Sequence, residues 1–163
     1  MRVKPVDVTC SDWSCTLESE GGQCVLRLGL RYVRGFRQAT AERIGACRAQ
    51  RAFTSISDLT KQVPELSKSD LQMLATVGAL NGIGMKAGVK LHRRNALWQV
   101  QKYGSHVPRM LEEIAEHDET SPLAPMTTEE RLVSDYHGTG VTIGPHPMTY
   151  RREQLRGMGI GSR

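Results

Sequence analysis

The chain has 163 residues, room for one domain or two small ones, and its 39% hydrophobic and 24% charged residues are typical of a globular protein rather than a disordered one. The net charge of +5 favours a polyanionic partner. No apolar run is long enough to span a membrane, and none follows the basic residues at the N-terminus. We therefore expect no signal peptide and a cytoplasmic protein.

The first part of the chain is predicted to be extended. Pro5 prevents an early helix, and the valines that follow Arg2 alternate loosely with polar residues. Residues 24–33 mix apolar with basic side chains, and their periodicity fits either a strand or a short helix. From Gln38 the pattern becomes helical, because apolar residues recur at helical spacing from Ala41 onward.

Caps and breakers predict the remaining helices. Ser67 and Asp70 are typical of a helix start and Gly78 of a helix end, while Thr127 and Glu130 form a capping box. Helices are predicted at residues 57–63, 67–78, 89–103, 107–116, 127–136 and 149–156, with a loop at 82–88 and a linker at 117–125. The predicted class is all-α, with a short extended N-terminal segment and a C-terminal helical extension.

Charges are segregated along the chain. Seven arginines and one acid lie between Arg27 and Arg51, five basic residues and no acid between Lys86 and Lys102, and seven acids without Lys or Arg between residues 111 and 130. One-signed basic blocks beside glycine-containing turns suit a phosphate backbone, although solvated helix faces give the same pattern.

No metal site is predicted. The four cysteines form no C-x-x-C pair, and the five histidines are scattered, so we interpret the cysteines as reduced thiols.

The segment from Leu30 to Ile44 resembles a helix-hairpin-helix motif. In that motif a tight turn presents backbone N–H groups at a helix N-terminus, where a DNA phosphate binds without base readout. Gly35 would allow the close approach, and neighbouring arginines would add positive charge. The usual second glycine is replaced by Arg37, a residue that tolerates a positive φ poorly.

The basic run that contains Lys90 is a candidate for a second phosphate site, with a solvated basic face as the alternative. The predicted DNA contacts are Arg34, Gly35, Phe36, Arg37, Thr40, Arg43, Lys90, Arg93 and Arg94.

Longer blocks of the sequence resemble error-prone DNA polymerases of the bacterial C family. The stretch LGLRYVRG at 28–35 carries the resemblance, together with FTSISDL at 53–59, LATVGALN at 74–81 and GPHPM at 144–148, in the family's order. The resemblance implies a tail from the end of the fingers region at 1–23, a tandem helix-hairpin-helix DNA-binding region at 24–104, and a linker with helices at 105–163 that leads to an oligonucleotide-binding fold.

The same resemblance implies a non-catalytic part of a larger enzyme. The family's palm-domain aspartates lie upstream of the matched region, and no D-x-D pair occurs here. We expect no catalytic residue and no cofactor in this chain, with magnesium used by the parent polymerase in translesion synthesis and DNA repair. The implied partners are duplex DNA, the rest of the polymerase and, through the parent, the sliding clamp and mutagenesis accessory proteins.

The alternative function is a protein-interaction module. In that case the acidic block at 111–130 and the helices beyond it would dock a polymerase partner, and the hairpin would be structural.

Overall fold

Residues 2–27 build a three-stranded sheet in the computed structural model, which describes residues 2–84, 91–103 and 124–159. Strands β1 (Arg2–Lys4), β2 (Thr16–Glu20) and β3 (Gln23–Arg27) lie in the order β1-β3-β2. β1 runs parallel and β2 antiparallel to β3. The all-α class is therefore only approximate, and the first part of residues 24–33 is a strand.

One face of the sheet carries an ionic network. Side chains alternate between the two faces of a strand, so Arg2 and Lys4 share a face. Arg2 pairs with Glu20 at 3.3 Å, and Lys4 with Glu18 at 3.1 Å. Arg27 donates to both carboxylate oxygens of Glu18, at 2.7 and 3.0 Å. This network ties all three strands together.

The opposite face carries an apolar row. Val3, Leu26 and Leu17 are directly opposite one another in the strand register. Leu17 is 67% exposed. A groove beside this row is lined by Val3, Leu26, Tyr32, Val141 and Ile143. The sheet therefore has one charged face and one partly uncovered apolar face.

The helices follow in the predicted order. They are the 3-10 helix η1 (Leu30–Tyr32), α1 (Gln38–Gln50), α2 (Ile56–Gln62), α3 (Lys68–Val77), α4 (Arg93–Tyr103), α5 (Thr128–Thr139) and α6 (Pro147–Gly157). The predicted helix at 107–116 and most of the linker at 117–125 lie outside the described residues.

Local signals set several helix ends. The Ser67–Asp70 capping box opens α3, and Gly78 closes it with φ +79°. The Thr127–Glu130 box opens α5. α6 begins two residues earlier than predicted, because Pro147 occupies its first turn, where proline is favoured.

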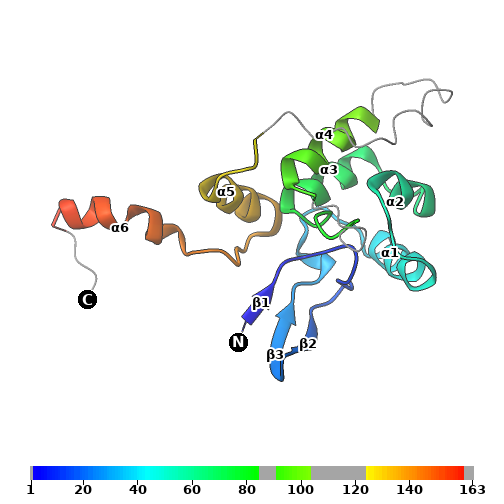
Figure 1. Ribbon diagram of the computed structural model, residues 1–163, viewed down its shortest axis with the longest axis horizontal. Coiled ribbons are helices and arrows are strands. Elements are labelled where there is room, and N and C mark those ends of the chain that lie inside the picture. The colour runs from blue at the N-terminus through cyan, green and yellow to red at the C-terminus, as the bar shows by residue number, and fades with distance from the viewer. Residues whose placement is uncertain (1, 85–90, 104–123, 160–163) are drawn as a thin grey trace.

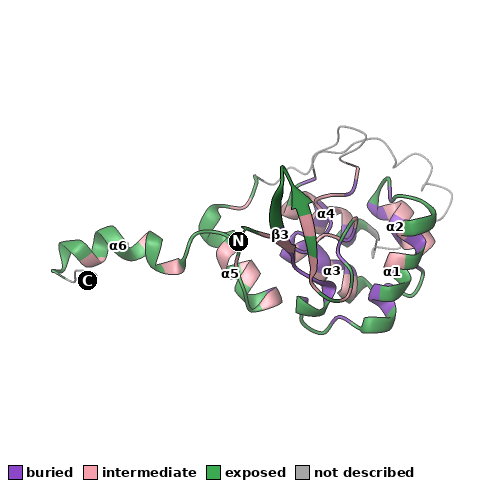
Figure 2. Cartoon of the chain, turned by 90° about the horizontal axis from the view of Figure 1, so that it is seen from below, coloured by how far each residue is buried: buried purple, intermediate pink, exposed green. Residues whose placement is uncertain are grey.

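The core lies among α1 to α4 and the N-terminal segment (Figure 2). Its largest fully buried side chains include Leu30, Ile44, Leu59 and Leu74. Figure 1 shows the sheet beside this helical body, α5 next to α3, and α6 projecting away from the rest of the molecule. None of the helices in the described residues is both long and apolar enough to cross a bilayer.

Candidate nucleic-acid interface

A tight turn joins η1 to α1. Gly35 has φ +73°, which is unfavourable for any residue with a Cβ, and the Phe36 N–H donates to the Val33 carbonyl at 3.1 Å. Arg37 has φ −91°, an ordinary extended value. The arginine in place of a second glycine therefore causes no backbone strain, because Gly35 alone takes the left-handed conformation.

The N-terminus of α1 has no side-chain cap. Arg37 is its N-cap residue and makes no capping hydrogen bond, and the first turn contains no acid. By contrast, side chains cap α2, α3, α5 and α6. A helix start leaves its first amides without intrahelical partners, and the helix dipole favours an anion there. The first turn of α1 therefore presents backbone amides without a side-chain acceptor, in a position where the helix dipole favours an anion.

The predicted arginines of the first hairpin lie at this end of α1 or on its exposed side. Arg37 lies 3.8 Å from Asp70 and Arg43 lies 3.7 Å from Glu65, in pairs whose arginine side chains are 66% and 54% exposed. Such exposed pairs are weak, so they leave the arginines available to a phosphate. The backbone N–H of Arg34 donates to the Gly138 carbonyl at 2.8 Å, so this amide already has an acceptor.

Phe36 and Thr40 are inside the protein. They are 7% and 4% exposed, respectively. Their side chains pack into the core and do not face a ligand. Of the predicted contact residues, these two therefore support the turn from inside.

The second basic cluster is held by α5. Arg93 pairs with Asp135 at 2.7 Å, and both side chains are largely buried. Arg94 pairs with Glu130 at 2.6 Å and donates to the Ala124 carbonyl. The Thr127 backbone N–H and then Arg94 hold the pKa of Glu130 below its ordinary value. Lys90 lies outside the described residues. Acidic side chains of α5 thus form ion pairs with Arg93 and Arg94, two of the cations predicted for a second phosphate site.

Comparison with known proteins identifies the hairpin. Residues 1–90, more than half of the chain, match the family described as "Helix-hairpin-helix motif". The chain belongs to the helix-hairpin-helix family. Its similarity also extends beyond the motif to a group of larger proteins.

These helix-hairpin-helix relatives are error-prone DNA polymerases. The chain is 40% identical over 157 residues to the error-prone DNA polymerase of Pseudomonas aeruginosa, which covers 96% of this chain and 14% of the relative. It is 39% identical over 157 residues to that of Alkalilimnicola ehrlichii, with the same coverage, and 35% identical over 175 residues to that of Methylococcus capsulatus, covering 95% of this chain and 16% of the relative. The chain therefore spans about one seventh of the length of these relatives, and the similarity to error-prone polymerases is confirmed.

Sequence reasoning missed the role of α5 beside the start of α4. The acidic block at 111–130 was visible, but the pairing of its Glu130 with Arg94, and of Asp135 with Arg93, depends on how α5 packs against α3. Gly138 is the residue that could have indicated this packing, because a Cβ there would clash with the Val77 side chain of α3. Within the described residues, no group of three or more His, Cys, Asp or Glu side chains gathers as a metal site would require.

Proposed function

We propose that this helix-hairpin-helix chain grips the phosphate backbone of duplex DNA, without reading its sequence, as part of an error-prone DNA polymerase. The observation that carries the proposal is the uncapped start of α1 behind Gly35, with Arg34 and Arg37 beside it. Family membership supports DNA as the ligand, since the motif's anion is a backbone phosphate.

In the longer protein this grip would hold the duplex while other regions add nucleotides. The same proposal includes magnesium-dependent DNA synthesis by the parent and its use in translesion synthesis and repair. It also includes a cytoplasmic location and contacts with the sliding clamp and accessory proteins. The names of the relatives support it.

The test is fluorescence anisotropy of the chain on two duplexes of unrelated sequence across a salt series. Loss of a phosphate contact makes the slope of log affinity against log salt shallower by about 0.9. Arg37→Ala removes one charge at the anion-binding end of α1. Gly35→Val opposes the positive φ and blocks close approach of a phosphate. Both variants are expected to weaken binding equally on the two duplexes.

Arg51→Ala is the matched control. It removes the same charge at the opposite end of α1, where Arg51 pairs with Asp58. Circular dichroism verifies that each variant is folded. If folded Gly35→Val and Arg37→Ala bind as Arg51→Ala does, the first hairpin is not the DNA contact. If the parent chain shows no salt-dependent binding, the interaction-module alternative replaces this proposal.

A further inference from the structure

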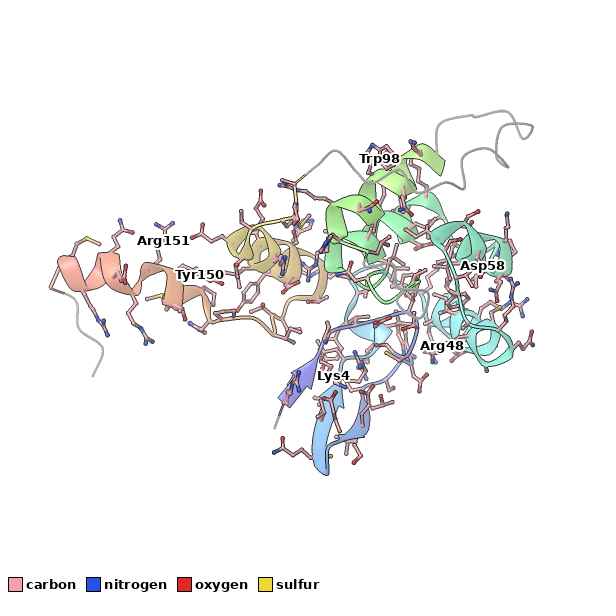
Figure 3. All side chains as sticks on the ribbon, viewed as in Figure 1. Lys4, Arg48, Asp58, Trp98, Tyr150 and Arg151 are labelled. Atoms are coloured by element: carbon pink, nitrogen blue, oxygen red, sulfur yellow. The ribbon has the colours of Figure 1, made fainter. Side chains whose placement is uncertain are left out.

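α6 carries a cluster of arginines with no carboxylate partner. Arg152 and Arg156 make no ion pair among the described residues, and Arg151 has only a 3.1 Å hydrogen bond to the neutral side chain of Gln154. All three are exposed. Figure 3 shows α6 away from the helical body, with Arg151 on its outer surface.

Four of the predicted hairpin cations differ in this respect, whereas Arg34, like the α6 arginines, makes no ion pair among the described residues. Arg37, Arg43, Arg93 and Arg94 each lie within 4.0 Å of a carboxylate oxygen. A polyanion that binds one of these four arginines shares it with a carboxylate of the chain, whereas one that binds α6 displaces only solvent ions. α6 therefore gathers three exposed arginines that no carboxylate of the described residues neutralises.

The helical spacing gathers the three arginines on one side. At 100° per residue, Arg151, Arg152 and Arg156 fall within an arc of about 140°, and they span about 7.5 Å along the axis. Successive phosphates of one DNA strand lie about 3.4 Å apart along the duplex axis, so this span covers roughly two intervals. The single acid of α6, Glu153, lies outside the arc. One face of α6 thus matches a short run of phosphates.

We propose that α6 is a second site for the phosphate backbone of DNA, contacted by Arg151, Arg152 and Arg156. The choice of DNA as the polyanion rests on the proposed function. The site is separate from the first hairpin, so it lengthens the surface over which the chain holds the duplex.

DNA should also stabilise α6 as a helix. α6 has 11 residues and buries none of them. An isolated helix of this length is marginal in water. Ion pairs between its arginines and DNA phosphates would stabilise α6, which packing against the rest of the protein does not do. Bound duplex should therefore raise the helix content of this segment.

The experiment compares two triple variants of the full chain on the same duplex. Changing Arg151, Arg152 and Arg156 to alanine should make the salt slope shallower by about 0.9 for each arginine that lies on a phosphate. Changing the same three residues to lysine keeps the charges and should preserve most of the slope. Because α6 buries no residue, neither change removes a buried contact, and thermal unfolding checks that the body is unaltered.

The outcomes separate this site from the hairpin. A shallower slope for the alanine triple, added to the effect of Arg37→Ala, supports both sites. An unchanged slope for the folded alanine triple, with Arg37→Ala still effective, overturns the α6 site and leaves the hairpin grip intact. The reverse pattern supports α6 and overturns the hairpin grip. If vesicles rich in phosphatidylserine raise the helix content of the chain and duplex DNA does not, α6 is a membrane-surface element and the proposal is wrong.

Discussion

Gly35, in the turn before α1, and Gly45, in the middle of α1, have opposite backbone requirements. Gly35 has φ +73° and Gly45 lies inside α1, yet a Cβ at either position meets no atom within 4 Å. Any difference between alanine substitutions at the two sites is therefore conformational rather than steric.

Gly35→Ala should destabilise the chain by about 1 kcal/mol, because an L-residue resists the left-handed region. Gly45→Ala should stabilise it by about 1 kcal/mol, because alanine is the better helix former. Urea unfolding measures both values. Equal effects of the same sign would mean that the turn at Gly35 relaxes without cost.

Glu18 makes the stability of the sheet depend on pH. The hydrogen bonds from Arg27, more than those from Lys4, lower the pKa of Glu18 from 4.5 to about 2. A carboxyl whose pKa is lower in the folded state contributes stability above its unfolded value and loses it as the pH falls through the folded value. The contribution of Glu18 should therefore be complete above pH 4.5 and disappear toward about pH 2.

Unfolding by urea at a series of pH values between 6 and 2 tests this dependence. Glu18→Gln should unfold more easily than the parent at pH 6, and the two chains should converge near the acid end. A gap that stays constant with pH would show that Glu18 acts through packing rather than through its charge.

At the scale of elements, α5 links the turn before α1 to the start of α4. The carbonyl of Gly138 accepts the Arg34 N–H of the hairpin turn, and Glu130 and Asp135 pair with arginines at the start of α4. α5 packs closely on α3, because at Gly138 there is no space for a Cβ beside Val77. α5 therefore holds these two regions together and neutralises Arg93 and Arg94.

Glu130→Gln separates these two effects. Glutamine still serves the capping box at Thr127, but it no longer neutralises Arg94. Freed Arg94 should reach a phosphate, and the salt slope of DNA binding should become steeper by about 0.9.

Glu129→Gln is the control for that change. It removes the same charge from the adjacent, exposed position on α5, which makes no ion pair among the described residues. Anisotropy across a salt series should show little change in slope for this variant. Identical slopes for the two variants would mean that Glu130 acts only through net charge.

Elements whose ends depend on local chemistry were predictable. Helix ends could be predicted at Ser67, Gly78 and Thr127, because a helix cap depends only on residues within one turn. The sheet was not recognised, because β1 has three residues and pairs in parallel with a strand about 20 positions later in the sequence. Likewise, the arginines of the candidate site were predictable, but their carboxylate partners come from distant elements and were not.

On the scale of the whole molecule, the N-terminal segment is fastened to the helical body. The Val8 N–H donates to the Ala79 carbonyl at 2.9 Å, and Arg48 of α1 donates to the carbonyls of Val8 and Ser11. Val8 itself is fully buried. The predicted boundary between residues 23 and 24 falls at the start of β3, which pairs with β1 and β2.

We expect the segment and the helices to unfold as one unit. Trp13 reports on the segment and Trp98 on α4, so Trp13→Phe and Trp98→Phe leave one fluorescent reporter in each part. Val8→Ala should lower the free energy of unfolding by about 2 kcal/mol through lost burial and the cavity left behind. Both reporters should show the same urea midpoint and the same shift.

Two separate midpoints, with only the Trp13 signal moved by Val8→Ala, would instead make residues 1–23 an independently melting tail. The measurement therefore decides the predicted domain boundary directly.

The basic sites and the apolar row of the sheet should respond in opposite ways to salting-out ions. Sulfate should screen the proposed phosphate contacts of the hairpin and of α6, and should therefore release DNA. The same ion strengthens apolar association, and Leu17, Tyr32 and Ile143 remain uncovered for it to act on. Rising sulfate should therefore first free the chain from nucleic acid and then drive it to self-associate through the sheet. Leu17→Ser should raise the sulfate concentration at which precipitation begins and leave DNA release unchanged.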